Sequence, residues 1–130
     1  PLPAFGIGIV YDGVNYFREE DPRLKDVNKK MAIGNGVGLG VSTSTNLYFD
    51  IEQKSIIAET NGKYPTIEAA RQKAIDVIEH KLIPFYNKMA LVGLLEMIGF
   101  LTFNTVGRYL LLRRATPKPY KIAEKVKIRA

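Results

Sequence analysis

The side chains that could carry chemistry are few in this chain and lie far apart. There is no cysteine, which excludes disulfides, thiolate catalysis and zinc–thiolate sites. The single histidine, His80, stands between Glu79 and Lys81 on the polar side of a predicted helix, where we expect it to face solvent. Asp50 and Glu52 share one face of a predicted strand, but two carboxylates supply too few ligands for a cation site. The sequence therefore predicts no enzyme, no metal site and no cofactor.

One acid stands out because of its surroundings. Glu96 is the only charged residue in the apolar stretch from Met89 to Gly107. A carboxyl group in such a helix must be paired, protonated or placed at a wet interface. Arg108 lies twelve residues further on, roughly 18 Å along a helix axis, and is too far away to be its partner on the same helix. We expect a basic partner on another segment or on another subunit.

The basic residues are concentrated at the C-terminal end. Gly107 to Ala130 contain eight of the 19 Lys and Arg residues and a single acid, a net charge of +7, whereas residues 1–106 carry −1. A pI near 9.6 with the charge gathered at one end favours an anionic partner, either nucleic acid or a phospholipid surface. Cations spaced along an extended arm suit the neutralisation of DNA phosphates rather than the recognition of bases. The cations predicted to do so are Arg108, Arg113, Arg114, Lys118, Lys121, Lys125, Lys127 and Arg129.

Residues 1–44 are predicted to form an N-terminal arm and a first helix. Phe5 to Val10 and Ile33 to Val41 alternate glycine with other, mostly apolar, residues, a period of two that is typical of extended segments with one bare face. Between them, Asp21 is a suitable N-cap and Pro22 a suitable first residue of a helix. The outer face of this helix either contacts phosphates or faces solvent, and it carries Arg23, Lys25, Lys29 and Lys30.

The rest of the chain is predicted to be a short β-hairpin, a helical hairpin and a tail. Within residues 45–62, Thr45 to Asp50 and Ser55 to Thr60 are predicted as two strands. Thr66 is the expected N-cap of a helical hairpin over residues 66–114, in which Pro84 kinks or ends the first helix and the second runs from about Asn87. Residues 115–130 are predicted to form an extended basic tail. The whole chain is expected to be a single, mainly α domain.

Three interpretations of the apolar stretch remain open. In the first, sister subunits cover Met89 to Gly107 in an oligomer that coats nucleic acid. In the second, these 19 residues span a bilayer and the basic tail stays in the cytoplasm. Glu96 opposes that interpretation, since a charge near a helix centre costs about 2.5–3.5 kcal/mol. In the third, the chain is a soluble oligomeric domain whose tail is only surface.

The organisation of the chain resembles the major coat proteins of filamentous DNA viruses of hyperthermophilic archaea, and is similar in plan to tristromavirus-like nucleocapsid subunits. The shared features are a short cysteine-free chain, an extended N-terminal arm, a helical hairpin and a polycationic end. The glycine-alternating segments do not match the all-helical coat pattern. The resemblance adds the cations of the first helix to the DNA-binding set: Arg23, Lys25, Lys29 and Lys30.

This resemblance also implies an assembly and a location. It implies a subunit that pairs as a dimer with itself or with a paralogous coat protein, polymerises helically and wraps double-stranded DNA in the A-form, with a possible lipid envelope outside. The protein would then reside in the virion nucleocapsid and, during assembly, in the host cytoplasm. On this interpretation the DNA is bound without sequence preference.

Overall fold

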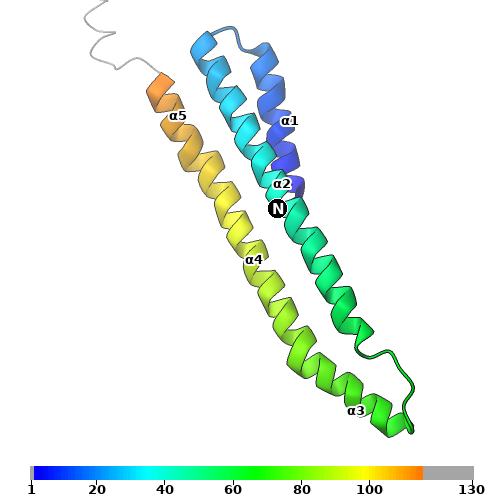
Figure 1. The fold of residues 1–130 in the computed structure, drawn as a ribbon. Helices are drawn as coiled ribbons and strands as arrows, with labels where there is room; N and C mark the ends of the chain where they lie inside the picture. Colours follow the sequence, from blue (N-terminus) through cyan, green and yellow to red (C-terminus); the bar gives the residue numbers. More distant parts are fainter. Residues whose placement is uncertain (1, 116–130) are drawn as a thin grey trace, which may run out of the picture. The chain divides into compact units, whose positions relative to one another are not determined.

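The computed structural model describes residues 2–115, and all its regular elements are helices (Figure 1). They are, in chain order, α1 (Leu2–Arg18), α2 (Pro22–Ala58), α3 (Ile67–Val77), η1 (Ile78–Leu82), α4 (Ile83–Thr102), η2 (Phe103–Gly107) and α5 (Arg108–Ala115). The prediction of a mainly α chain is confirmed, and no strand occurs within residues 2–115. The predicted extended tail lies, apart from Ala115 in α5, outside the described residues.

Helix α2 begins where the sequence predicts it. The Arg23 amide donates a hydrogen bond to Asp21 Oδ1 at 2.9 Å, and the Lys25 amide donates to the Asp21 carbonyl at the same distance. Pro22 occupies the first helical position, where its missing amide proton leaves no partner unsatisfied. Helix α2 then continues for 37 residues, far past the predicted end of the first helix.

The predicted extended segment Ile33 to Val41 is wrong, because it is helical throughout. Its glycines, two residues apart, are two interleaved sets with helical spacing of four. A Cβ on Gly34 would lie 2.0 Å from the Phe103 ring, and one on Gly38 would lie 2.2 Å from the Phe5 ring, whereas nothing lies within 4 Å at Gly36 or Gly40. One set therefore faces packed aromatic rings and the other faces outward.

The predicted β-hairpin is also wrong. Thr45 to Asp50 lie within α2, and Ser55 to Thr60 form the end of α2 and the turn after it. The Ser44 and Thr45 hydroxyls donate to the carbonyls of Gly40 and Val41, each at 2.9 Å. A hydroxyl bonded four residues back satisfies its polar group inside the helix, which removes one local reason for the chain to leave it.

The N-terminal arm is likewise helical, since Phe5 to Val10 lie in α1. Phe5 is buried and meets the Phe100 ring edge-on, with centroids 5.1 Å apart. The bare Cα of Gly8 leaves room for the Asn35 amide, whose Nδ2 would lie 2.7 Å from an added Cβ. The glycines of this segment therefore serve helix–helix approach rather than an extended conformation.

The predicted helical hairpin over residues 66–114 is a single helix of 49 residues, Ile67–Ala115. Its start is as predicted, because Thr66 Oγ1 accepts a hydrogen bond of 3.1 Å from the Ala69 amide. Pro84 does not end it. The preceding segment η1 has π-helical geometry, with the Ile83 amide bonded to the Ile78 carbonyl, and this wider turn accommodates the proline ring. Figure 1 shows the change of direction between α3 and α4.

The chain comprises two compact units, to both of which α2 and α4 contribute. Unit 1 consists of residues 1–39 and 98–130, of which the structure describes 2–39 and 98–115. Unit 2 consists of Gly40–Met97. In each unit the helix α2 and the 67–115 helix run antiparallel. In unit 1 Asn35 contacts Asn104 and Val27 lines a recess with Leu111. In unit 2 the pairs run from Ser42–Glu96 through Glu52–Lys88 to Glu59–Lys81.

Candidate functional site

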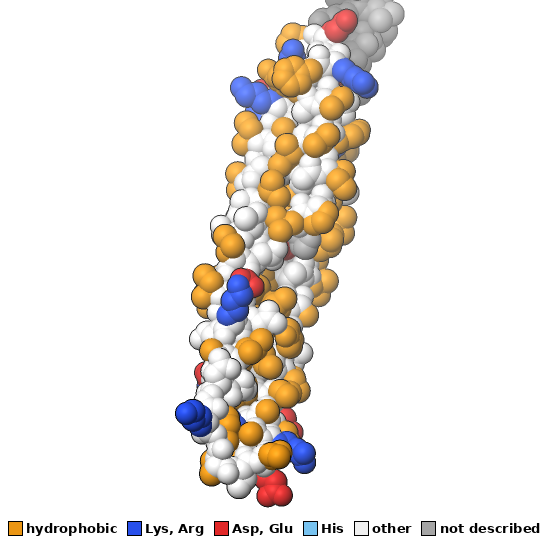
Figure 2. Space-filling model, turned by 90° about the vertical axis from the view of Figure 1, so that its right-hand side faces the viewer, with side chains coloured by type: hydrophobic (Ala, Val, Ile, Leu, Met, Phe, Trp, Pro, Cys, Tyr) orange, Lys and Arg blue, Asp and Glu red, His pale blue; other side chains and the backbone are white. Residues whose placement is uncertain are grey.

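Unit 1 buries polar side chains beside apolar ones such as Phe5 and Met31, and it exposes many large apolar side chains. Asp12 and Asn35 are 0% exposed. Apolar side chains, in contrast, are exposed along α1, the first half of α2 and the end of the 67–115 helix: Ile7, Val10, Val14, Phe17, Ile33, Val37, Leu101, Val106 and Leu110. Figure 2 shows hydrophobic side chains over much of the visible surface of the described helices. Buried polar groups thus coexist with an extensive exposed apolar surface.

The two buried polar residues in the described part of unit 1 belong to one connected polar cluster, defined here as Asp12 and Asn35 together with the partly buried Asn104 and Arg108. Asn35 Nδ2 donates to Asp12 Oδ2 and to Asn104 Oδ1, both at 3.0 Å, and Asn104 Nδ2 donates back to Asn35 Oδ1 at 2.8 Å. The same Asn104 amide donates to the Phe100 carbonyl at 2.9 Å. These bonds join α1, α2 and η2, and an interior network of this kind specifies one arrangement of its helices.

Arg108 closes the polar cluster electrostatically. Its Nη2 lies 2.8 Å from Asp12 Oδ1, an oxygen that accepts no hydrogen bond of good geometry within residues 2–115, so the ion pair compensates that buried charge. The guanidinium carbon lies 5.5 Å from the centre of the Tyr11 ring, and the Arg108 side chain is 24% exposed. Arg108, predicted as a phosphate ligand, is therefore engaged inside the protein.

In unit 2, Glu96 has a hydroxyl partner. Ser42, which is buried, donates to Glu96 Oε2 at 3.1 Å, while Oε1 is buried without a hydrogen-bond partner among the described residues. Within residues 2–115 no ion pair connects Glu96 to the basic residue that we predicted on another segment. Its carboxyl group lies against α2 rather than on the exposed face of α4.

The remaining candidate acids of unit 2 form surface ion pairs rather than a metal site. Asp50 pairs with Lys54 at 2.9 Å, and Glu52 accepts two hydrogen bonds from Lys88 at 2.7 and 2.9 Å. The bond to Glu52 raises the pKa of Lys88 above its usual 10.5. His80 is exposed, as predicted, with Nδ1 3.2 Å from Asp76. Among the described residues no group of three or more His, Asp or Glu side chains could hold a metal ion.

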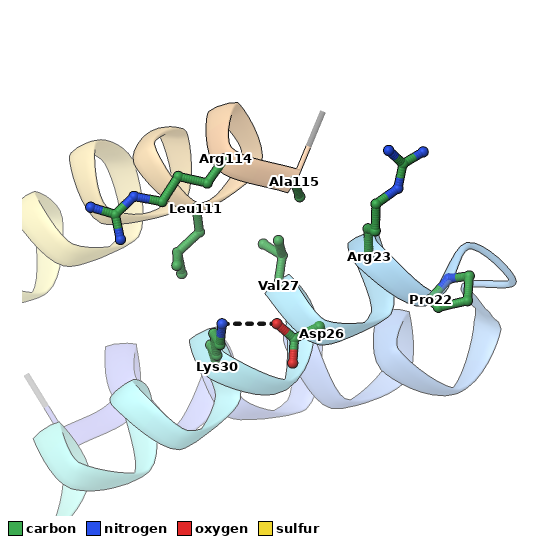
Figure 3. Close-up of a pocket in the computed structure, with 8 residues that line it drawn as sticks. All are labelled: Pro22, Arg23, Asp26, Val27, Lys30, Leu111, Arg114 and Ala115. Carbon is green, nitrogen blue, oxygen red and sulfur yellow. Dashed lines mark ion pairs between the residues drawn. The ribbon is translucent and has the colours of Figure 1, made fainter. Parts of the chain in front are cut away.

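A second candidate site, the basic recess, lies in unit 1 between the start of α2 and α5 (Figure 3). Its volume is about 370 Å³. Val27 and Leu111 form its apolar floor, and Lys30 is ion-paired with Asp26 at 2.9 Å. The complete lining is Pro22, Arg23, Asp26, Val27, Lys30, Leu111, Arg114 and Ala115.

The structure brings part of the predicted DNA-binding set together at this recess. Arg23, Lys30 and Arg114 line it, and Lys29 and Arg113 are exposed on the same two helices. Lys25 instead lies over the Tyr16 ring, 4.8 Å from its centre. The other predicted residues, Lys118, Lys121, Lys125, Lys127 and Arg129, lie outside the described part of the chain.

The polar cluster was not predicted from the sequence. Asp12 and Asn35 each stand alone among apolar and glycine residues, and Asn104 lies four residues before Arg108. An isolated polar side chain in an apolar helix signals an interior partner, because the helix exterior offers it none. That signal was present in the sequence, but it does not identify the partner. For Asn35 the partner Asn104 is 69 residues away in the chain.

The 67–115 helix is long and apolar enough to cross a membrane by length and composition, and none of its most apolar 18-residue window is buried. A core helix of a water-soluble protein passes the same test of composition but is mostly buried. No protein-family profile, no curated protein and no solved structure matches this chain.

Proposed function

We propose that this chain is a membrane-embedded helical protein, whose exposed apolar side chains contact acyl chains and whose polar cluster holds its helices together. The observation that carries the proposal is the burial of polar side chains beneath an apolar exterior: Asp12, Asn35 and Ser42 are buried, while many large apolar residues of the same helices are exposed. In water this arrangement would leave large apolar patches uncovered, which single soluble proteins avoid. In hydrocarbon it is favourable, since polar groups find partners only inside the protein.

The lengths of two helical stretches support this placement. Met31 to Phe49 in α2 and Met89 to Gly107 are each 19 residues long. The first has no charged residue and the second has only Glu96. A helix of that length rises roughly 28 Å, close to the roughly 30 Å thickness of a bilayer's hydrocarbon core. Lys30 and Asp50 bound the first stretch, and Lys88 and Arg108 bound the second.

The charge of Glu96, which opposed a membrane location in the sequence, is partly accommodated. Its carboxyl group faces the Ser42 hydroxyl on α2 instead of the apolar exterior. Likewise Asp12 and Arg108 face each other. Ionisable groups that are paired inside a helical bundle are the kind that membrane segments tolerate.

The proposal is tested by placing a charge on the exterior. Val41 lies in the middle of the uncharged stretch of α2 and is 55% exposed, and Ile57 lies near the end of the same helix and is 46% exposed. We expect Val41→Lys to reduce membrane insertion by about 2.5–3.5 kcal/mol, because a lysine at a span centre is desolvated. Ile57→Lys should insert normally. The measurement is flotation with liposomes that contain no nucleic acid, after a high-salt wash.

A water-soluble protein gives the opposite result. There both lysines lie on a wetted surface, and both variants should be at least as soluble as the parent chain. If the parent chain stays in the supernatant without detergent, and Val41→Lys behaves as Ile57→Lys does, the membrane proposal is wrong.

A second candidate function is the packaging of double-stranded DNA by a helical coat, in which sister subunits rather than lipid cover the apolar exterior. The cations Arg23, Lys29, Lys30, Arg113 and Arg114 are exposed on two helices of unit 1, which favours a polyanionic partner. On this proposal, affinity for random-sequence duplex falls steeply with salt. Neutralising Lys121, Lys125, Lys127 and Arg129 should flatten that dependence. A salt-independent or sequence-selective affinity excludes it.

A further inference from the structure

We propose that the basic recess binds the headgroup phosphate of an anionic phospholipid, with the first carbons of its acyl chains on the apolar floor. This proposal rests on the membrane proposal above. The recess is lined by α2 residues up to Lys30, and the uncharged stretch of α2 begins at the next residue, Met31. Its other wall, Leu111 to Ala115, begins four residues after the apolar stretch ends at Gly107. The recess therefore lies just beyond the hydrocarbon stretch on both helices, at the depth of lipid headgroups.

The charge of the lining fits an anion. The lining contains three cations, Arg23, Lys30 and Arg114, and a single acid, Asp26. Asp26 is paired with Lys30, and Arg23 lies 3.6 Å from Asp21 outside the recess. Arg114 forms no ion pair with a described carboxylate, and its guanidinium can donate two parallel hydrogen bonds to a phosphate. The first turn of α2 adds the positive end of a long helix dipole, close to Arg23.

The apolar floor selects the kind of anion. Val27 is almost completely buried, and Figure 3 shows Val27 and Leu111 pointing into the space between the two helices, with the Arg23 and Arg114 side chains extending outward in different directions. Free phosphate and the DNA backbone have no apolar part that would use such a floor. A phospholipid has an anionic phosphate followed by apolar acyl chains, and basic pockets between membrane helices are suited to its headgroup.

The chain has no tryptophan, so a single introduced indole is a specific probe of the recess. Ala115 lines the rim, and its replacement by Trp places the probe beside Arg114. The full-length Ala115→Trp protein is reconstituted in vesicles of phosphatidylcholine and phosphatidylglycerol, in which one or the other lipid is brominated. We expect brominated phosphatidylglycerol to quench the tryptophan fluorescence more strongly than its mole fraction in the bilayer predicts.

Two charge-matched variants locate the effect. Arg23→Gln/Arg114→Gln removes two cations from the recess, whereas Lys29→Gln/Arg113→Gln removes two cations from neighbouring positions that do not line it. We expect the enrichment of phosphatidylglycerol to fall about fivefold for each recess cation removed. The second variant should retain it. Equal losses in the two variants mean a diffuse surface effect and overturn the proposal.

The remaining outcomes separate this proposal from the one on which it rests. Equal quenching by both brominated lipids overturns the recess as a lipid site and leaves the membrane proposal standing. Absence of quenching by either lipid overturns both. Displacement of the lipid by inorganic phosphate or by short duplex DNA identifies a phosphate or nucleic-acid site instead. If the Trp variant does not fold, native mass spectrometry of the unmodified chain in detergent, with each lipid added, gives the same comparison.

Discussion

Units 1 and 2 use the same two long helices but place their polar residues differently. In unit 1 charged and amide side chains are buried, as in the polar cluster of Asp12 and Asn35, and apolar residues are exposed. In unit 2, Phe49 and Phe85 are buried with ring centroids 5.8 Å apart, and the Lys88–Glu52 and Lys81–Glu59 pairs lie outside, although large apolar residues such as Ile51 and Ile67 are exposed here too. On the membrane proposal, this difference fits one helix pair to two solvents along its length.

The first and largest expected effect comes from opening the ion pair of the polar cluster. Arg108→Met leaves the Asp12 carboxylate buried without a counter-charge, and should destabilise the fold by about 3–5 kcal/mol. Adding Asp12→Asn keeps an acceptor for Asn35 and removes the charge, so the double variant should recover most of that loss. Denaturant unfolding in detergent measures both.

The surface pair of unit 2 is the matched reference for this cycle. Lys88→Met removes the partner of Glu52, whose side chain remains partly exposed, and should have a far smaller effect, because solvent screens an exposed pair. If Arg108→Met is as mild as Lys88→Met, Asp12 is solvated in the protein and the contrast between the units disappears.

The second prediction tests the role of the glycines in α2. A Cβ on Gly38 meets the buried Phe5 ring, so Gly38→Ala should cost about 1–3 kcal/mol through displacement of α1. Gly36→Ala is the control, because its Cβ would meet nothing within 4 Å and alanine favours a helix interior by about 0.5–1 kcal/mol. Thermal unfolding of the two variants should therefore shift in opposite directions. Equal destabilisation by both would point to an unseen partner on the Gly36 face.

The smallest effect concerns the pH dependence of unit 2. Lys88 has its pKa raised by the hydrogen bond from its ammonium group to Glu52, so its folded-state pKa lies above its unfolded value. The stability that this pair contributes is fully present below the unfolded pKa of about 10.5, and is lost as the pH rises through the higher folded value. Melting curves at increasing alkaline pH should show a small decline that Lys88→Met abolishes. A decline of the same size in the variant would assign it to other groups.

Local signals predicted helix starts well and helix continuity poorly. Asp21 and Thr66 were both identified as N-caps because a cap and the amide it accepts from lie within three residues of each other. Pro84 was expected to kink the helix or end it, and the helix continues through it with a change of direction (Figure 1). The π-helical turn that precedes the proline was not predicted, because its residues have no local signature of their own. The glycine spacing was compatible with a strand period and with two helical faces, and only the contacts with Phe5 and Phe103 distinguish them.

The amino-acid sequence by itself determined the composition and the charge distribution of this protein: no cysteine, one histidine, an excess of cations at one end and two long stretches almost without charge. Those properties are sums over residues or depend on neighbours within a turn. Tertiary structure alone decided that Asp12, Asn35, Asn104 and Arg108 meet, and that Arg108 is held inside rather than offered to a phosphate. Their meeting requires helices brought together from distant parts of the chain, and no local pattern encodes which faces those helices turn toward each other.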